Sequence, residues 1–257
     1  MSLPLRRNES VLGSIPEAIM SPPAPSSVPT NVTVISEIPF VINRAHFKKM
    51  VRLESYPELE DELEEFLDRA DTTARPKGMY REDFVEEVGE EAVKIAGAEF
   101  TSEILADKLG HVPRVFPYIA TCGAELDELD LSAYDMMLSG LWHSTYKMQA
   151  LGTAAGHLKG VLKERFEIRI LSSINPGSGN VDVWPVDQQL PLFSLFGDTE
   201  EAIGVRLTDS CLMIPDKTIS GIYFPSKIEY CNCHSCTREN CPSRRAPYQG
   251  PSNPVVH

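Results

Sequence analysis

The sequence is most informative at Ile203-Gly-Val-Arg-Leu-Thr-Asp-Ser-Cys-Leu-Met-Ile-Pro215 and, two residues later, at Thr218-Ile-Ser-Gly-Ile-Tyr-Phe224. Apolar and β-branched residues predict strands at 201–207 and 218–224. Upstream of this stretch, apolar residues recur mainly at helical spacing. Helices first and strands later predict an α+β fold rather than the strand–helix alternation of a doubly wound sheet.

Helical spacing predicts four helices in the first two thirds of the chain. They are expected at 45–53 after Asn43 as N-cap, from Pro57 onward, across 84–95, and at 133–166. Ser132–Asp135 is interpreted as a capping box that opens the last helix. One face of this helix is expected to be formed by Met137, Leu141, Met148, Leu151, Ala155, Leu158 and Leu162.

Shorter elements surround these helices. A buried strand is predicted at 115–121, a further strand at 166–171, and a short helix at 186–196. The glycines of the long helix, among them Gly140, Gly152 and Gly156, lower helix propensity but allow another element to approach closely.

The ends of the chain differ in composition from its middle. Residues 1–30 contain six of the twenty prolines, which predicts a flexible proline-rich arm over 1–35. A folded domain is expected over 36–228, followed by a cysteine-rich segment and tail over 229–257. A chain of 257 residues with 42% hydrophobic residues can fill the core of one such domain.

Charge and hydropathy exclude several classes of function. The formal net charge is −13, and residues 54–103 alone carry seventeen acidic against five basic side chains. These acids are interpreted as solvated faces or, alternatively, as a docking face for a basic partner. Nucleic-acid binding is not expected, since it requires clustered Lys and Arg. The sequence has no membrane-spanning apolar run and no secretory signal, so we expect a cytoplasmic protein with reduced thiols.

Four of the six cysteines form a cluster, Cys231-Asn-Cys233-His-Ser-Cys236-Thr-Arg-Glu-Asn-Cys241. Four thiolates on one segment can surround a single centre, and both iron–sulfur clusters and zinc use such ligands. We therefore predict these cysteines as metal ligands, with an iron–sulfur cluster favoured over zinc. Unliganded or disulfide-paired cysteines are the remaining alternative.

The stretch quoted first resembles the activation domain of cobalamin-dependent methionine synthase. That family has Leu-Thr-Glu-Ser…Met-x-Pro before Val-Ser-Gly-x-Tyr-Phe, and the resemblance extends loosely over residues 36–225. Pro176-Gly177 and Trp184-Pro185 follow the family's order. The resemblance implies a single α+β domain in which a helical half packs on a twisted antiparallel sheet. The cysteine cluster is an addition to the family's pattern.

The resemblance also implies ligands and partners. The family's domain binds S-adenosylmethionine and presents it to the cobalamin of a neighbouring module. Tyr223, Gly177 and Pro176 are the residues here that match its binding motifs. The Asp-x-His-x-x-Gly signature of cobalt-ligating proteins is absent, so a corrinoid is expected only through a partner.

One departure from the family bears on S-adenosylmethionine. The family's motif is Arg-x-x-x-Gly-Tyr, but Ser173 stands at the arginine position and Ser178 follows Gly177. A guanidinium pairs bidentately with a carboxylate, and serine does not replace it.

Two main hypotheses follow, with a third that retains the ligand site. The first is a partner of a corrinoid protein or methyltransferase, in which the cysteine segment holds an iron–sulfur cluster and receives electrons from a donor. The second is a non-catalytic, zinc-stabilised binding or assembly module. The third is an altered S-adenosylmethionine-binding domain.

Overall fold

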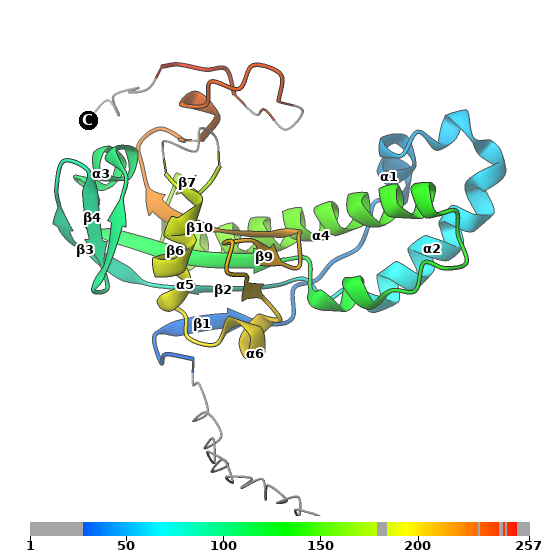
Figure 1. Cartoon of the computed structure of the whole chain (residues 1–257), viewed down its shortest axis with the longest axis horizontal. Coiled ribbons are helices and arrows are strands. Elements are labelled where there is room, and N and C mark those ends of the chain that lie inside the picture. The colour runs from blue at the N-terminus through cyan, green and yellow to red at the C-terminus, as the bar shows by residue number, and fades with distance from the viewer. Residues whose placement is uncertain (1–27, 179–183, 231, 242–243, 245, 251–257) are drawn as a thin grey trace, which may run out of the picture.

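The computed structural model describes residues 28–178, 184–230, 232–241, 244 and 246–250. A helical end and a sheet end lie side by side, and the long helix α4 (Met136–Arg165) runs through both (Figure 1). No helix in these ranges is long and apolar enough to cross a membrane.

The main sheet is antiparallel and centred on β6. One edge of β6 pairs first with β2 and then with β3, and its other edge pairs with β10, which in turn pairs with β7. The strands of this sheet are β1 (Val32–Ile35), β2 (Lys77–Arg81), β3 (Asp83–Val88), β4 (Ala92–Ile95), β5 (Ala98–Thr101), β6 (Arg114–Thr121), β7 (Leu171–Ile174) and β10 (Thr218–Pro225). A separate hairpin joins β8 (Arg206–Leu207) to β9 (Met213–Ile214).

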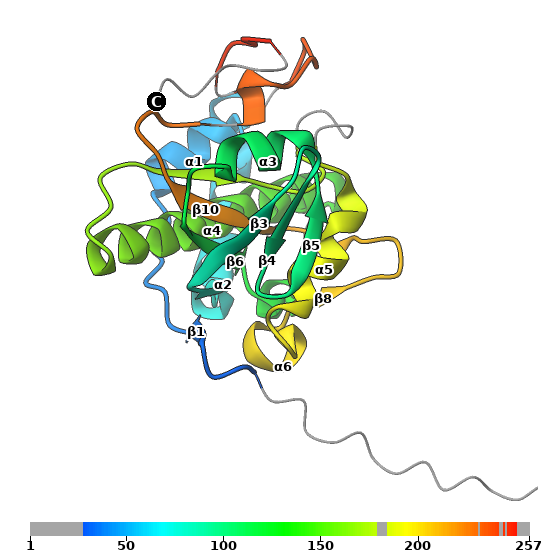
Figure 2. The same cartoon turned by 90° about the vertical axis from the view of Figure 1, so that its left-hand side faces the viewer.

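The shorter helices pack around the sheet and beside the start of α4. They are α1 (Arg44–Met50), α2 (Glu60–Thr73), α3 (Glu103–Leu109), α5 (Gln189–Ser194) and α6 (Thr199–Ile203). Figure 2 looks at the sheet end, where β3, β4 and β5 lie beside α3 and α5.

Each face of the sheet has its own apolar core. α4 covers one face, where Tyr118, Leu158 and Tyr223 are buried. Helices α3 and α5 cover the other face, which includes Ile222 and Phe224. At the helical end a third cluster is built around aromatic rings that meet edge to face: Phe40, Phe47, Phe66, Tyr134 and Tyr146.

The α+β prediction is confirmed, as are several of its elements. The strands predicted at 115–121 and 218–224 correspond to β6 and β10, and the short helix at 186–196 corresponds to a 3-10 turn and α5. Asn43 caps α1 as predicted, because its side-chain Oδ1 accepts a hydrogen bond from the backbone N–H of His46 at 3.0 Å. Val32–Ile35, which the sequence placed in the arm, form β1; residues 1–27 lie outside the described ranges.

The helix predicted across 84–95 is wrong, because this region forms β3 and β4. Phe84 and Val88 recur at helical spacing, yet their side chains are exposed. Val93 and Ile95 are buried and alternate with period two, and the chain turns at Gly89. Strand pairing across this hairpin overrides the local helical pattern.

Three boundaries also differ from the predictions. The strand expected at 201–207 is mainly α6, which is capped by Asp198 and ends at Gly204 with φ +71°. The strand expected at 166–171 begins only at Leu171. The N-cap of α4 is Asp135 itself, not Ser132, because Asp135 accepts from the N–H groups of Met137 and Leu138.

The buried face of α4 agrees with the prediction in the second half of the helix, where Leu158 and Leu162 are buried, but not in the first half. Met137, Leu141 and Met148 were expected to lie on one apolar face, but they are exposed to solvent. The buried positions of α4 are Ser139, Trp142, Tyr146, Lys147, Ala150, Ala154, Leu158 and Leu162.

Candidate functional site

A cavity of about 420 Å³ lies between α4 and the strands β6, β7 and β10. We call it the α4 pocket. Its walls come from three parts of the chain: the sheet, the exposed face of α4, and the segment that follows β10. The residues that matter below are Tyr118, Ser173, Asn175 and Tyr223 of the sheet side, Gly152, Gly156 and Lys159 of α4, and Glu229, Tyr230 and Asn232.

Two stacked tyrosines form the floor of the α4 pocket. The rings of Tyr118 and Tyr223 are 3.8 Å apart between centroids and inclined by only 16°. Strand pairing brings them together, since Tyr118 lies opposite Gly221 and Tyr223 lies opposite Phe116 on neighbouring strands. The Tyr223 hydroxyl donates to the carbonyl oxygen of Ala155 in α4 at 3.3 Å, which ties the floor to the helix.

A closed ring of hydrogen bonds lies beside this floor. Asn175 Nδ2 donates to Tyr118 Oη at 2.8 Å, and Ser173 Oγ donates to Asn175 Oδ1 at 3.0 Å. The Tyr118 hydroxyl then donates to Ser173 Oγ at 3.0 Å. Because Asn175 also donates to the carbonyl oxygen of Ser220 at 2.7 Å, all of its amide groups are partnered. The ring is neutral and fixes all three side chains.

Close packing requires the glycine of the Ser220-Gly221-x-Tyr-Phe motif. A Cβ at Gly221 would lie 2.4 Å from the carbonyl oxygen of Ile174 and 2.4 Å from Asn175 Nδ2. Only glycine lets β10 approach β7 this closely while Asn175 reaches across to Ser220. The motif therefore encodes the floor of the pocket through its backbone as well as through Tyr223.

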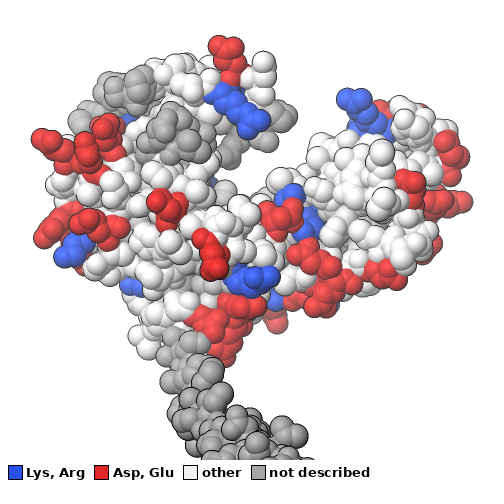
Figure 3. All heavy atoms as spheres, in the orientation of Figure 1, with Lys and Arg blue, Asp and Glu red and all other residues white. Residues whose placement is uncertain are grey.

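The opposite wall is the exposed side of α4. Apart from adjacent residues and the backbone of α4 itself, no heavy atom of the described residues lies within 4 Å of a Cβ built at Gly140, Gly152, Gly156 or Gly160. The close approach that these glycines predicted is therefore not made by another described element of this chain. Exposed Met137, Leu141 and Met148 lie on the same helix. Figure 3 shows that the surface is hollowed here and mostly uncharged, whereas acidic side chains gather along the lower edge of the molecule.

Tyr223 lines the α4 pocket, whereas Pro176 and Gly177 do not. Both lie in the turn after β7, next to Asn175. Gly177 has φ +68°, and its N–H donates to the carbonyl oxygen of Trp184 at 2.8 Å. They shape the turn that positions Asn175. Sequence reasoning missed Tyr118 and Asn175, whose only signals were a place in or beside a predicted strand or turn.

The cysteine segment folds next to this site. The Arg244 guanidinium donates to the carbonyl oxygens of Cys233 and Cys236 at 3.3 and 3.1 Å, and so holds the segment in a compact turn. In the described part of the chain, no three His, Cys, Asp or Glu side chains are placed to hold one metal ion. Cys231 lies outside the described residues. The described residues Cys233, Cys236 and Cys241 thus do not form a ligand set, and the four-cysteine site stays a prediction.

The two cysteines outside this segment, Cys122 and Cys211, are buried. Burial raises the pKa of the Cys122 thiol to about 12, so this group is protonated near neutral pH.

Asn232 joins the cysteine segment to the α4 pocket. It follows Cys231 and precedes Cys233, and its Nδ2 donates to the carbonyl oxygens of Asn175 and Ser178 at 3.2 and 2.9 Å. These two acceptors fix the orientation of the amide, because a carbonyl cannot donate a hydrogen bond. Its Oδ1 is buried and has no hydrogen-bond partner among the described residues.

Residues 168–246 match the family model of the vitamin B12-dependent methionine synthase activation domain. The match confirms the resemblance seen in the sequence. It covers β7, the turn at Pro176-Gly177, β10 and the segment that closes the α4 pocket, and it continues through the cysteines beyond residue 225.

A solved structure shares the fold. The crystal structure of the MetH reactivation domain bound to AdoHcy is similar with a TM-score of 0.54 and 15% sequence identity, over 78% of this chain and 81% of that one. At this identity the likeness concerns the fold. No curated protein sequence matches the chain.

Proposed function

We propose that this protein is a partner of a corrinoid-dependent methyltransferase and serves in its reductive activation, as a methionine synthase activation domain does. The α4 pocket carries the proposal. Tyr223 of its floor, and Ser173 and Asn175 beside it, lie in the region that matches the family, and the pocket opens onto the exposed, mostly uncharged side of α4. A partner that carries a corrinoid would cover the exposed methionines and glycines of α4 and face the pocket.

The pocket supports binding of an adenosyl ligand by a site that differs from the family's. Ser173 stands where the family has arginine, and its hydroxyl is engaged with Asn175 and Tyr118. A ligand carboxylate therefore needs another cation. Lys159 lines the pocket from α4 and pairs with Glu229 at 2.6 Å, with its side chain partly exposed. We assign the role of carboxylate partner to Lys159.

Calorimetry with S-adenosylmethionine and AdoHcy tests the ligand. Binding is expected for the intact protein and should weaken by about tenfold in Lys159→Met, because a charge-assisted hydrogen bond is lost. Lys163→Met, which removes an exposed lysine one turn further along α4, is the matched control and should bind like the parent. Equal binding by both variants, or no heat at millimolar ligand, contradicts the assignment.

A corrinoid methyltransferase tests the partnership. The enzyme is poised with inactive cobalt(II), and activity is measured after adding reductant, S-adenosylmethionine and this protein. Activity should return with the protein and fall sharply with Leu141→Glu, which places a charge on the exposed face of α4. Recovery that is the same with and without the protein contradicts the proposed function.

The cysteine segment supports a finer proposal, an iron–sulfur cluster held by Cys231, Cys233, Cys236 and Cys241, with zinc as the alternative. A cluster would supply electrons for cobalt reduction. The support is the spacing of the four thiols within eleven residues, together with the hydrogen bond that Asn232, inside the segment, donates to Ser178 beside the pocket. Anaerobically purified protein should contain iron and acid-labile sulfide, and Cys241→Ser should lower both. About one equivalent of zinc with no visible absorption favours the zinc-stabilised binding module instead.

A further inference from the structure

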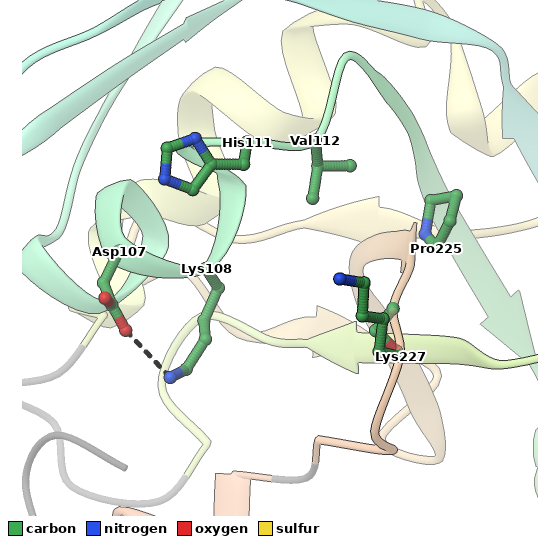
Figure 4. Close-up of a pocket in the computed structure, with 7 residues that line it drawn as sticks. Asp107, Lys108, His111, Val112, Pro225 and Lys227 are labelled. Atoms are coloured by element: carbon green, nitrogen blue, oxygen red, sulfur yellow. Dashed lines mark hydrogen bonds and ion pairs between the residues drawn. The ribbon is translucent and has the colours of Figure 1, made fainter. Parts of the chain in front are cut away.

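A second cavity, of about 410 Å³, lies where β10 ends beside α3. We call it the α3 pocket. Asp107 and Lys108 reach it from α3, His111 and Val112 from the loop that follows, and Pro225, Ser226 and Lys227 from the end of β10. Figure 4 shows Lys108 and Lys227 on opposite sides of this space, with His111 and Val112 above them.

The walls of the α3 pocket carry an excess of positive charge. Only 3% of the Lys108 side chain is exposed, and its ammonium pairs with Asp107 at 2.8 Å and lies 5.3 Å from the centre of the Tyr230 ring. Lys227 is exposed and makes no ion pair with any described residue. Asp107 offsets one of the two lysines, so the cavity is positive by at least one charge in a chain of net charge −13.

An apolar groove continues from this cavity. The groove shares His111, Val112 and Pro225 with the α3 pocket and adds the side chains of Phe84, Phe166 and Ile168. Arg114 borders it, held by Glu82 at 3.1 Å and lying 5.5 Å from the Phe166 ring centre. Phe84 is an exposed aromatic residue here, so part of the apolar surface faces solvent.

We propose that the α3 pocket binds the anionic head group, carboxylate or phosphate, of a small amphiphilic metabolite whose apolar part lies along this groove. Lys108 and Lys227 supply opposed donors for the head group. The desolvated position of Lys108 strengthens its attraction for an anion, since the local dielectric is lower than in water. The adjoining apolar surface favours a ligand with a hydrocarbon or aromatic body over a bare ion.

Hexyl phosphate, hexanoate and inorganic phosphate serve as probes, titrated into the ¹⁵N-labelled full-length protein and followed by NMR. Amide signals of Val112 and Lys227 should shift saturably with hexyl phosphate or hexanoate, and the tighter of the two identifies the head group. Inorganic phosphate should bind at least about tenfold more weakly than hexyl phosphate, because it lacks the apolar part. Lys227→Met should weaken the binding of hexyl phosphate by about tenfold. Lys49→Met, which removes an exposed lysine on α1, should leave this binding unchanged.

Several outcomes would overturn the proposal. These are the absence of saturable binding by either amphiphile, equal affinity for inorganic and hexyl phosphate, or equal effects of Lys227→Met and Lys49→Met. A hexaglutamate peptide that binds the site more tightly than the amphiphiles would assign it to an acidic protein partner instead. Because the probes, variants and signals differ from those of the α4 pocket, failure here leaves the proposed function untouched.

Discussion

The end of β10 and the residues that follow it border both pockets, but in different chemical surroundings. Pro225 and Lys227 line the α3 pocket beside a second lysine, whereas Tyr230 and Asn232 line the α4 pocket beside a neutral ring of hydrogen bonds. The α4 pocket depends on close backbone packing within the sheet. The α3 pocket depends on charges brought together by a helix end and a loop. The first should therefore respond to changes in shape and the second to changes in charge.

Gly221→Ala should have the largest effect of these changes, and it should impair the α4 pocket while the α3 pocket still binds its ligand. The added methyl group meets the backbone of β7, so we expect a loss of about 3 kcal/mol in the free energy of unfolding and loss of AdoHcy binding. Gly160→Ala is the matched control, and in an open helical position it should raise stability by up to about 1 kcal/mol. Urea unfolding measures both. Hexyl phosphate should still bind to the folded fraction of Gly221→Ala, and a loss of both ligands would mean that the pockets are not independent in shape.

Tyr118→Phe should damage the α4 pocket alone. Without the hydroxyl, Asn175 loses an acceptor and Ser173 loses a donor in a buried site, which costs about 2 kcal/mol. Tyr223→Phe removes a longer hydrogen bond to Ala155 and should cost about 1 kcal/mol or less. Thermal melts compare the two variants. If Tyr223→Phe costs as much as Tyr118→Phe, the ring of hydrogen bonds is not what holds the floor.

Acid should loosen the start of β10, next to Asp216. Although burial opposes the shift, hydrogen bonds from Lys147 and Lys217 lower the pKa of Asp216 to about 2. A carboxyl group whose pKa is lower in the folded state stabilises that state at pH values above its pKa in the unfolded chain, about 3.9. This contribution is lost as the pH falls toward the folded-state pKa of about 2.

Lys147→Met checks this assignment. The Asp216 side chain is largely exposed, so solvent screening limits the expected loss at neutral pH to about 1 kcal/mol. Urea midpoints measured against pH should converge for Lys147→Met and the parent at the acid end. A difference that persists there would assign the effect to packing of the lysine stem instead.

Added salt should produce the smallest of these differences between the two pockets, a difference in how far ligand affinity falls. Raising ionic strength should weaken hexyl phosphate binding about two- to fivefold, because partly exposed charges are screened. A neutral adenosine probe at the α4 pocket should be nearly unaffected. Equal salt responses would mean that charge does not distinguish the two sites.

The sequence predicted the α4 pocket better than the α3 pocket for a physical reason. Gly221 and Tyr223 lie in one strand, so a single sequence motif contains one of the two tyrosines of the floor and the glycine beside it. Tyr118 and Asn175 complete it through strand pairing, which no local pattern reveals. Lys108 and Lys227 are far apart in the chain and meet only because α3 and the end of β10 are neighbours.

The errors in secondary structure have a related origin. Helical spacing at 84–95 was local, whereas the pairing of β3 with β4 and β6 that replaced it depends on the sheet. For α4, the length of the helix followed from its sequence, but its buried face was predicted correctly only at Leu158 and Leu162. The elements that pack against the helix decide that its methionines are exposed and that Tyr146 and Lys147 are buried.

Tyr230 lies between the two pockets: its ring faces the Lys108 ammonium, and the residue lines the α4 pocket. Any occupant that shifts this ring on one side changes the wall on the other. Binding at the two sites is then thermodynamically linked, and the factor by which one ligand alters the affinity of the other must be the same in both directions. If both proposed ligands bind, an anion held at the α3 pocket would in this way alter the affinity of the α4 pocket for its own ligand.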